Sequence, residues 1–148
     1  MIREIKADEI ETVAHLGTEF FAEAKLPGSF RPAVFCRTWK NLITLGMGFV
    51  LAAYKGNDRP VGILGAIVTQ DINDGETVAQ EAFWFMSAES RGSLESVRLF
   101  RMFEQTARER GAKRFIMVHL LALKADKLSK FYERMGYRAV EVNFVKEI

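Results

Sequence analysis

The chain contains little cysteine, histidine and proline, and it has no long uninterrupted apolar run. Its single cysteine, Cys36, cannot form an internal disulfide, and its two histidines cannot supply the clustered ligands of a zinc site. A membrane-spanning helix requires about 20 apolar residues, so we expect neither a bound metal nor a membrane segment. The polar, acidic start of the chain also lacks the apolar core of a signal peptide. We therefore expect the protein to remain in the cytoplasm.

Charge of one sign does not dominate, because the formal net charge is only +2 at pH 7. This balance does not indicate a nucleic-acid-binding protein, and we expect no nucleic-acid partner. The distribution is less even, since residues 1–30 are mainly acidic and residues 91–114 mainly basic. The basic region would suit an anionic ligand, although solvated helix faces account for most runs of this kind.

The length and composition indicate one domain over residues 1–148. The chain has 148 residues, of which 49% are hydrophobic, enough for one sizeable core but not for two ordinary domains. The first half predicts a strand at residues 1–5, then a helix to residue 24 that opens with an Asp8–Glu11 capping box. Pro32 suits the first turn of a second helix. Strands follow at residues 48–54, 60–68 and 78–86, and Asn57 and Asp58 form part of the first turn between them.

The second half predicts one helical crossover and a last helix. Residues 93–110 have separate apolar and charged faces at helical spacing, and Gly111 ends that helix. Residues 114–121 are apolar almost throughout, like a strand covered on both faces. Asp126 would cap a short helix that ends at Gly136, and residues 137–147 would form a closing strand. The order β-α-α-β-β-β-α-β-α-β indicates an α/β (α+β) domain of three layers, with a mixed, mostly antiparallel sheet flanked by helices.

The segment SAESRGSLESVRLF, residues 87–100, joins the third meander strand to the amphipathic helix. Gly92 would let the backbone approach a ligand closely, and the helix start offers unpaired N–H groups and a positive dipole end. Arg91 could add a positive charge. The alternative is that Ser90 or Ser93 simply caps the helix. Neither G-x-G-x-x-G nor a P-loop motif is present, so a Rossmann or P-loop nucleotide site is disfavoured.

Arg91-Gly92 after an aromatic strand, followed by ARERGAKRF, IMVHLL and KFYERMGYRAVEV, resembles the GNAT superfamily of N-acetyltransferases. The resemblance covers most of the chain and implies acetyl-CoA as cosubstrate. It implies that a loop of the form [Q/R]-x-x-G-x-[G/A] holds the cofactor pyrophosphate with backbone amides, while amides of the preceding strand polarise the thioester. The implied cofactor-binding residues are Phe85, Met86, Arg91, Gly92, Ser93, Leu94, Glu95 and Ser96.

The chain departs from the family pattern at two places. Leu94 occupies the position of the middle glycine of the loop, and Ser96 the position of its last small residue. The Cβ of Leu94 restricts positive φ and fills space near the amides, whereas a helical conformation there would still direct its N–H at a phosphate. An asparagine that often precedes the last helix is replaced by Ala125 and Asp126.

Three residues are candidates for proton transfer. Tyr132 matches the tyrosine of the family segment LYxxxGF, which implies a general acid for the departing thiolate, although a core aromatic residue is an equal alternative. Glu81, on the strand before the loop, is placed like glutamates that act as general base in some members. An exposed strand residue or an ion-pair partner is the plainer interpretation of Glu81. His119 is the rival base, with a hydrogen-bonded core histidine as its alternative.

The resemblance implies an enzyme that transfers an acetyl group from acetyl-CoA to a primary amine by direct attack in a ternary complex. A noncatalytic module with the same fold, acting through a protein partner, is the alternative, and Leu94 and the absent asparagine favour it. The acceptor stays open between small molecules and peptides. Similar folds frequently form homodimers through strand or helix edges.

Overall fold

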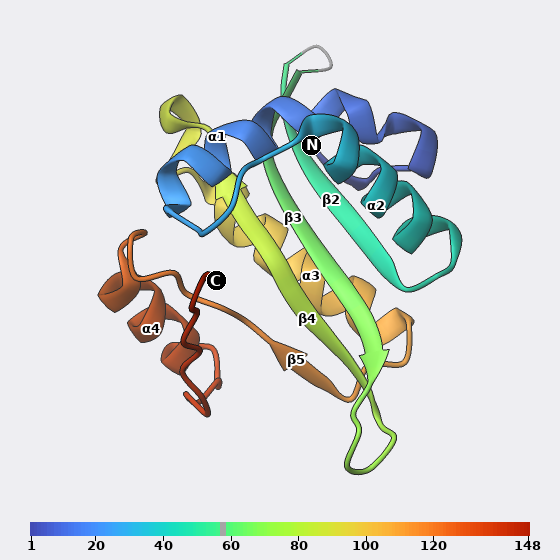
Figure 1. Cartoon of the computed structure of the whole chain (residues 1–148), viewed down its shortest axis with the longest axis vertical. Coiled ribbons are helices and arrows are strands. Elements are labelled where there is room, and N and C mark those ends of the chain that lie inside the picture. Colours follow the sequence, from blue (N-terminus) through green and yellow to red (C-terminus); the bar gives the residue numbers. More distant parts are fainter. Residues whose placement is uncertain (57–58) are drawn as a thin grey trace.

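The computed structural model describes residues 1–56 and 59–148, and its centre is a five-stranded sheet (Figure 1). The strands lie in the order β1-β2-β3-β4-β5. Strands β1 to β4 pair with one another in antiparallel fashion, and β5 pairs with β4 in parallel. The predicted mixed, mostly antiparallel sheet is therefore confirmed, whereas the turn residues Asn57 and Asp58 lie outside the described residues. The strands are β1 (Ile2–Glu4), β2 (Gly48–Lys55), β3 (Arg59–Gln70), β4 (Thr77–Met86) and β5 (Arg114–Ile116).

Helices cover both faces of this sheet and give the three layers that the sequence predicts. The α1–α2 side and the α3 side each have their own cluster of buried apolar residues. Phe83 and Phe85 of β4 lie in the first cluster, and Ala79 and Met86 in the second. The helices are η1 (Ala7–Val13, 3₁₀), α1 (Ala14–Ala24), α2 (Pro32–Thr44), η2 (Ala88–Ser90, 3₁₀), α3 (Leu94–Glu109) and α4 (Ala125–Arg134).

A β-bulge interrupts β4 beside the candidate base. Gly65 pairs with Phe83 and Ala66 with Glu81, so Ala82 is the extra residue. The bulge shifts the alternation of side chains, and for this reason Ala79 and Phe83 lie on opposite faces although they are four residues apart. Gly65 makes room for Phe83, since a Cβ on Gly65 would lie 2.3 Å from Phe83 Cζ. A glycine and a bulge thus shape the sheet next to Glu81.

The first helical segment starts differently from its prediction, because Asp8 and Glu11 do not form the capping box. Glu9 takes this role: its carboxylate accepts a hydrogen bond of 2.8 Å from Lys6 N–H. The same carboxylate accepts two more from Arg3, at 2.9 and 3.0 Å. Chiefly through the Arg3 bonds, the pKa of Glu9 falls from 4.5 to about 2. Spacing alone did not identify the carboxylate that Arg3 of the neighbouring strand would hold in place.

The end of the chain also departs from the prediction. The strand expected at residues 114–121 is confirmed only as β5, and residues 137–147 form no strand. Val140, Val142 and Phe144 are exposed in that last segment. Alternation of apolar and polar residues predicts a strand only where a neighbouring edge is available, and here the sheet ends at the short β5. The chain end instead contacts the loop after α1, where Gly28 N–H donates to Glu147 at 3.0 Å.

The predicted cap of the last helix is likewise wrong. Lys124, in a left-handed conformation with φ of 47°, is the N-cap of α4, and no side chain caps this end. Asp126 lies inside the first turn, where its negative charge interacts favourably with the positive end of the helix dipole.

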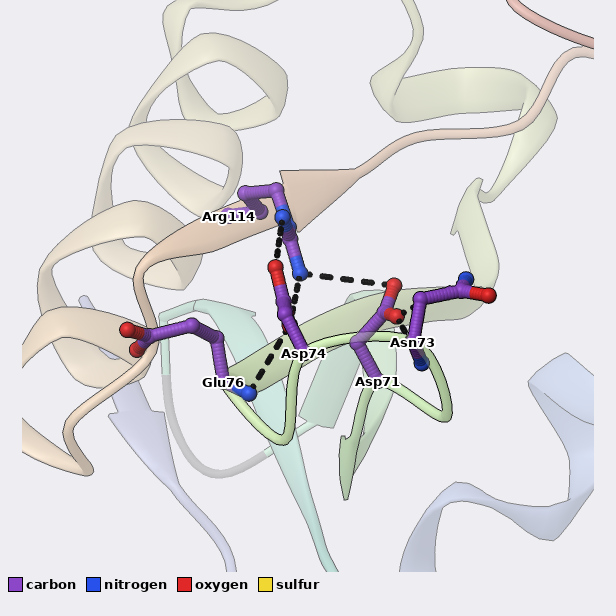
Figure 2. Close-up of polar contacts among 5 residues, drawn as sticks. All are labelled: Asp71, Asn73, Asp74, Glu76 and Arg114. Atoms are coloured by element: carbon purple, nitrogen blue, oxygen red, sulfur yellow. Dashed lines mark hydrogen bonds and ion pairs between the residues drawn. The ribbon is translucent and has the colours of Figure 1, made fainter.

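An ion-pair network fixes the start of β5 relative to the β3–β4 turn (Figure 2). Arg114 donates to both carboxylate oxygens of Asp74, at 2.8 and 2.9 Å, and lies 3.3 Å from Asp71. The turn is ordered by its own bonds, because Asp71 accepts from Asn73 N–H and Asp74 accepts from Glu76 N–H. An exposed ion pair contributes little to stability alone, but this bidentate pair gives β5 a defined register beside β4.

We expect Gly65→Ala to destabilise the protein by about 1 to 3 kcal/mol, because the added methyl overlaps the Phe83 ring. The measurement is the free energy of unfolding in urea for Gly65→Ala, Phe83→Leu and the double variant. If the ring causes the loss, the double variant is more stable than the sum of the single effects predicts. Strict additivity would show that Phe83 does not transmit the strain.

Candidate functional site

A cavity lies where the chain after β5 separates from β4. The parallel ladder contains only three residue pairs and ends at Gln80 and Ile116. Beyond it, β4 and the segment from residue 117 onward form two walls of a cavity of about 190 Å³. The other walls come from α1 with its following loop and from α4. Glu81 and Tyr132 both line this cavity.

Val118 joins these two candidate catalytic residues. Its backbone N–H donates a hydrogen bond of 3.0 Å to Glu81 Oε2, and its carbonyl accepts one of 2.8 Å from the Tyr132 hydroxyl. Val118 lies just past the end of the β4–β5 ladder, where a backbone group needs a new partner. The Glu81 carboxylate provides that partner for the N–H group, and Tyr132 provides it for the carbonyl. The separation of the strands therefore brings a carboxyl and a phenol together.

Glu81 is deeply buried, with only 6% of its surface exposed. Loss of hydration raises its pKa from 4.5 to about 7, although the bond from Val118 N–H lowers it in part. The plainer interpretation of Glu81 as an exposed strand residue is therefore wrong. A carboxyl with a pKa near neutrality can accept a proton at physiological pH and release it again.

Tyr132 is buried on the inner side of α4. Burial raises its pKa well above the usual 10, and the nearby Glu81 charge raises it further, so the phenol keeps its proton at physiological pH. Aromatic contacts hold the helix in place: Phe131 packs against Phe100 of α3 and Trp84 of β4, with ring centroids 5.0 and 5.9 Å apart. Tyr132 can donate a proton elsewhere only if its hydroxyl turns away from Val118 O.

Trp84 carries an unsatisfied donor. It is one of the residues that line the cavity, but its Nε1 is buried and has no hydrogen-bond partner among the residues that the structure describes. A buried N–H without a partner costs about 1 to 3 kcal/mol.

The loop before α3 leaves the start of that helix open. Ser93 is the N-cap residue, but no side chain caps the helix, because Ser93 Oγ donates to Ser90 O at 2.7 Å. Ser90 Oγ is buried and also lacks a partner within the described chain. The alternative in which a serine caps α3 is therefore wrong. Backbone N–H groups at the start of α3 are left for an anion.

Gly92 and Leu94 do not obstruct this helix start. Gly92 has a φ of +74°, which favours glycine, and no atom lies within 4 Å of the position that a Cβ would take. Leu94 is the first residue of α3 and is 72% exposed. A helical residue needs no positive φ, so the departure from the family pattern at this position does not close the loop. Two other predicted residues have local bonds: Ser96 N–H donates to Ser93 O, and Glu95 pairs with Arg98 at 2.7 Å.

Arg91 is engaged by the protein itself. Its guanidinium contacts both Glu23 carboxylate oxygens at 2.6 Å, its Nε donates to Met86 O at 3.0 Å, and it lies over the Phe85 ring. The arginine thus connects the end of α1 to the end of β4. Its charge is already paired, so it orients the loop in this structure and does not form a free anion contact.

The two residues at the end of β4 face different directions. Ser87 N–H donates to Val61 O on β3, and in an antiparallel pair the inward-facing backbone groups alternate along the strand. The backbone of Phe85 therefore also faces β3, while that of Met86 faces the separated edge. The Phe85 side chain packs in the α1–α2 core, so of these two predicted cofactor-binding residues only Met86 directs a main-chain N–H toward the opening, while its carbonyl accepts from Arg91.

His119 does not join Glu81 and Tyr132. Its side chain is exposed and is not part of the cavity lining. Nδ1 lies 3.0 Å from both Ala125 O and Ser129 Oγ at the start of α4. The alternative of a hydrogen-bonded core histidine is wrong, because His119 forms its hydrogen bonds at the surface and not in the core.

Sequence reasoning missed Val118, Trp84 and Glu23. Val118 acts through its backbone, so its side chain carries no signal. Trp84 looked like an ordinary strand aromatic, and Glu23 looked like a solvated helix residue 68 positions away from its partner Arg91. Within residues 1–56 and 59–148 no group of three His, Cys, Asp or Glu side chains could hold a metal ion. In the same residues no helix has the length and apolarity to cross a membrane.

No protein-family model matches the chain, and no curated protein matches it significantly. Solved structures do resemble it over its whole length. A ribosomal-protein-alanine N-acetyltransferase from Brucella melitensis biovar Abortus 2308 is 16% identical with a TM-score of 0.74, covering 100% of this chain and 99% of that one. A predicted acetyltransferase with acetyl-CoA from Clostridium acetobutylicum is 10% identical with a TM-score of 0.80, covering 99% and 95%. A transcriptional regulator from Bacillus halodurans C-125 is 20% identical with a TM-score of 0.80, covering 100% and 99%.

At these identities the likeness shows the fold. The chain has the three-layer fold of these solved structures, two of which are named as acetyltransferases.

The burial of Glu81 predicts a pH-dependent stability. Between pH 4.5 and about 7 the folded protein holds a proton that the unfolded chain releases, so this group makes unfolding easier as the pH rises through that window. We expect the free energy of unfolding of Glu81→Gln, relative to that of the wild type, to rise by on the order of 3 kcal/mol between pH 4.5 and 8. Urea unfolding at several pH values measures the difference. Glu89→Gln, at an exposed position, is the control, and an unchanged difference for Glu81→Gln would contradict the raised pKa.

Proposed function

We propose that the protein is an N-acetyltransferase that moves an acetyl group from acetyl-CoA to a primary amine by direct attack in a ternary complex. The observation that carries this proposal is the pair of bonds on Val118, which directs a carboxyl with a pKa near 7 and a protonated phenol into one cavity. The open start of α3 supplies amides for an anion close to the end of the same strand, β4. The fold shared with proteins named acetyltransferases supports the proposal.

The residues present fit acetyl-CoA. Gly92 leaves open space in a conformation that a Cβ would strain, and the first amides of α3 are not capped by a side chain. We infer that backbone N–H groups of residues 92–95 hold the pyrophosphate and that Met86 and Trp84 hold the pantetheine end. Arg91 positions the loop through Glu23. When bound, acetyl-CoA supplies a thioester whose carbonyl carbon accepts a nucleophile.

Glu81 and Tyr132 divide the proton transfers between them. As the amine nitrogen bonds to the carbonyl carbon, Glu81 takes a proton from that nitrogen, and the carbon–sulfur bond then breaks. Tyr132 gives its proton to the departing sulfur after its hydroxyl leaves Val118 O. The protein contributes mainly by holding both reactants in a small cavity and by aiming donors at the carbonyl oxygen. His119 has no part in this scheme, because its side chain lies outside the cavity lining.

A noncatalytic binding module is the second candidate, and one observation favours it. The Arg91–Glu23 pair neutralises the charge that the loop would offer to a phosphate. A transcriptional regulator with the same fold shows that the fold is not limited to proteins named as enzymes. The two candidates differ in whether acetyl-CoA binds and is consumed.

Acetyl-CoA binding gives the first test. We expect calorimetric titration to show micromolar affinity, and Gly92→Val to weaken it at least about tenfold, because the side chain strains the loop and fills the open space. Gly75→Val is a matched control, since Gly75 also has a positive φ and open surroundings but lies in the β3–β4 turn. Absence of binding at millimolar acetyl-CoA would favour the noncatalytic module.

Turnover gives the second test. We expect Tyr132→Phe to lower kcat by about 100-fold while KM for acetyl-CoA changes little, because only proton donation is lost. Tyr137→Phe is the control, since that hydroxyl donates to Glu104 and does not reach the cavity. Equal losses for both variants, or equal changes in kcat and KM, would remove Tyr132 from its role.

The pH profile gives the third test. We expect kcat/KM to rise with pH through about 7, as Glu81 loses its proton and becomes a base. This step should be absent from the residual activity of Glu81→Gln, which keeps the shape of the side chain but cannot accept the proton. A wild-type profile that is flat between pH 6 and 8 would contradict Glu81 as the base.

A further inference from the structure

Most side chains that line the cavity beside Glu81 are apolar, and this limits which acceptor the cavity can bind. Glu81 is the one charged side chain among its described lining residues, and Tyr132 supplies the one hydroxyl. The wall facing them is made of five hydrophobic side chains from α1, the loop after it, the segment after β5 and α4. These are Phe20, Leu26, Leu120, Leu123 and Leu128.

One carboxylate can pair with one ammonium group. A substrate with a second positive charge would have to bury it against leucine and phenylalanine side chains, where none of the described lining residues would pair with it. Glu23, near the end of α1, is already paired with Arg91. The charge of the cavity therefore favours a substrate with a single amine.

The size of the cavity limits the acceptor further. Its volume of about 190 Å³ is smaller than the roughly 300 to 1,000 Å³ of sites for drug-sized ligands. Leu26 is 37% exposed, so the apolar wall continues to the surface and can meet the carbon body of the acceptor as it enters. Burial of that body contributes about 25 cal/mol for each Å² removed from water.

We propose that the acceptor is a small primary amine with an apolar carbon skeleton and no second charge. This inference rests on the proposed acetyl transfer and names its substrate class. In the reaction the amine nitrogen bonds to the acetyl carbon and the bond from that carbon to the CoA sulfur breaks. The bound ammonium group first releases one proton to solvent, so that the neutral nitrogen can attack. During the attack the nitrogen loses a second proton to Glu81, which passes it to solvent, and the sulfur leaves as the thiol with the Tyr132 proton, which solvent replaces. The products are an N-substituted acetamide and CoA.

An acceptor panel tests the class with 2-phenylethylamine and n-hexylamine against spermidine and kanamycin, by release of CoA thiol at saturating acetyl-CoA. We expect kcat/KM for the two apolar monoamines to exceed that for the two polycations by at least about 100-fold, because the second charge is left unpaired. Equal or better turnover of either polycation would overturn the proposal.

A pair of variants tests whether the cavity itself discriminates between apolar monoamines and polycations. Leu123→Glu places a second carboxylate on the lining, and we expect it to raise the ratio of kcat/KM for spermidine to that for 2-phenylethylamine at least about tenfold. Leu121→Glu is the matched control, because Leu121 is 88% exposed and does not line the cavity. The same change of ratio in both variants would place the acceptor elsewhere.

Direct binding separates this inference from the proposed function. Trp39→Phe leaves Trp84 as the one tryptophan of the chain, so its fluorescence reports on the cavity that it lines. We expect 2-phenylethylamine to change this fluorescence saturably and spermidine to leave it unchanged, whether or not acetyl transfer follows. Amine binding without acetyl-CoA turnover would refute the proposed function alone. Acetyl-CoA binding and turnover without binding of the apolar amine would refute the acceptor class alone.

Discussion

The bond from Val118 N–H to Glu81 is the constraint on which the site depends. It forms where the parallel ladder between β4 and β5 ends, so it satisfies a backbone donor that the sheet no longer pairs. The same bond keeps a carboxyl in a place with little water, which raises its pKa toward neutrality. Tyr132 completes the arrangement by satisfying the carbonyl of the same residue. A gap in a sheet thus becomes a cavity lined by one carboxyl and one phenol.

The gap is braced at both ends. At the closed end, Arg114 ties β5 to the turn between β3 and β4 through Asp74 and Asp71 (Figure 2). At the open end, Arg91 ties the loop before α3 to Glu23 of α1. The first brace sets where β4 and β5 run together, and the second links the helix over the cavity to the loop that would hold an anion. The Arg114–Asp74 contact is bidentate, and its planar geometry fixes direction as well as distance, whereas Arg91 contacts both Glu23 oxygens through the single nitrogen Nη2.

Much of the fold was predictable, because it depends on patterns within single segments. Helical spacing identified α3, and β-type runs separated by turn residues identified β2, β3 and β4. The failures occurred where a segment depends on its neighbours: the cap at Glu9 needed Arg3, and the strand expected at residues 137–147 needed a sheet edge that the short β5 does not offer. In the site, Glu81, Tyr132 and Gly92 were found from residue type and family resemblance.

The sequence by itself determined the three-layer order of elements, the glycine that opens the loop and the supply of one carboxyl and one phenol for the cavity. Periodicity and residue chemistry are local properties, so they can be recognised in the sequence alone. Tertiary structure alone decided that Glu81 is buried, that Val118 joins it to Tyr132, that Glu23 holds Arg91 and that His119 stays outside. Burial and pairing arise between residues far apart in the chain, and they set the charge state and the reach of each group.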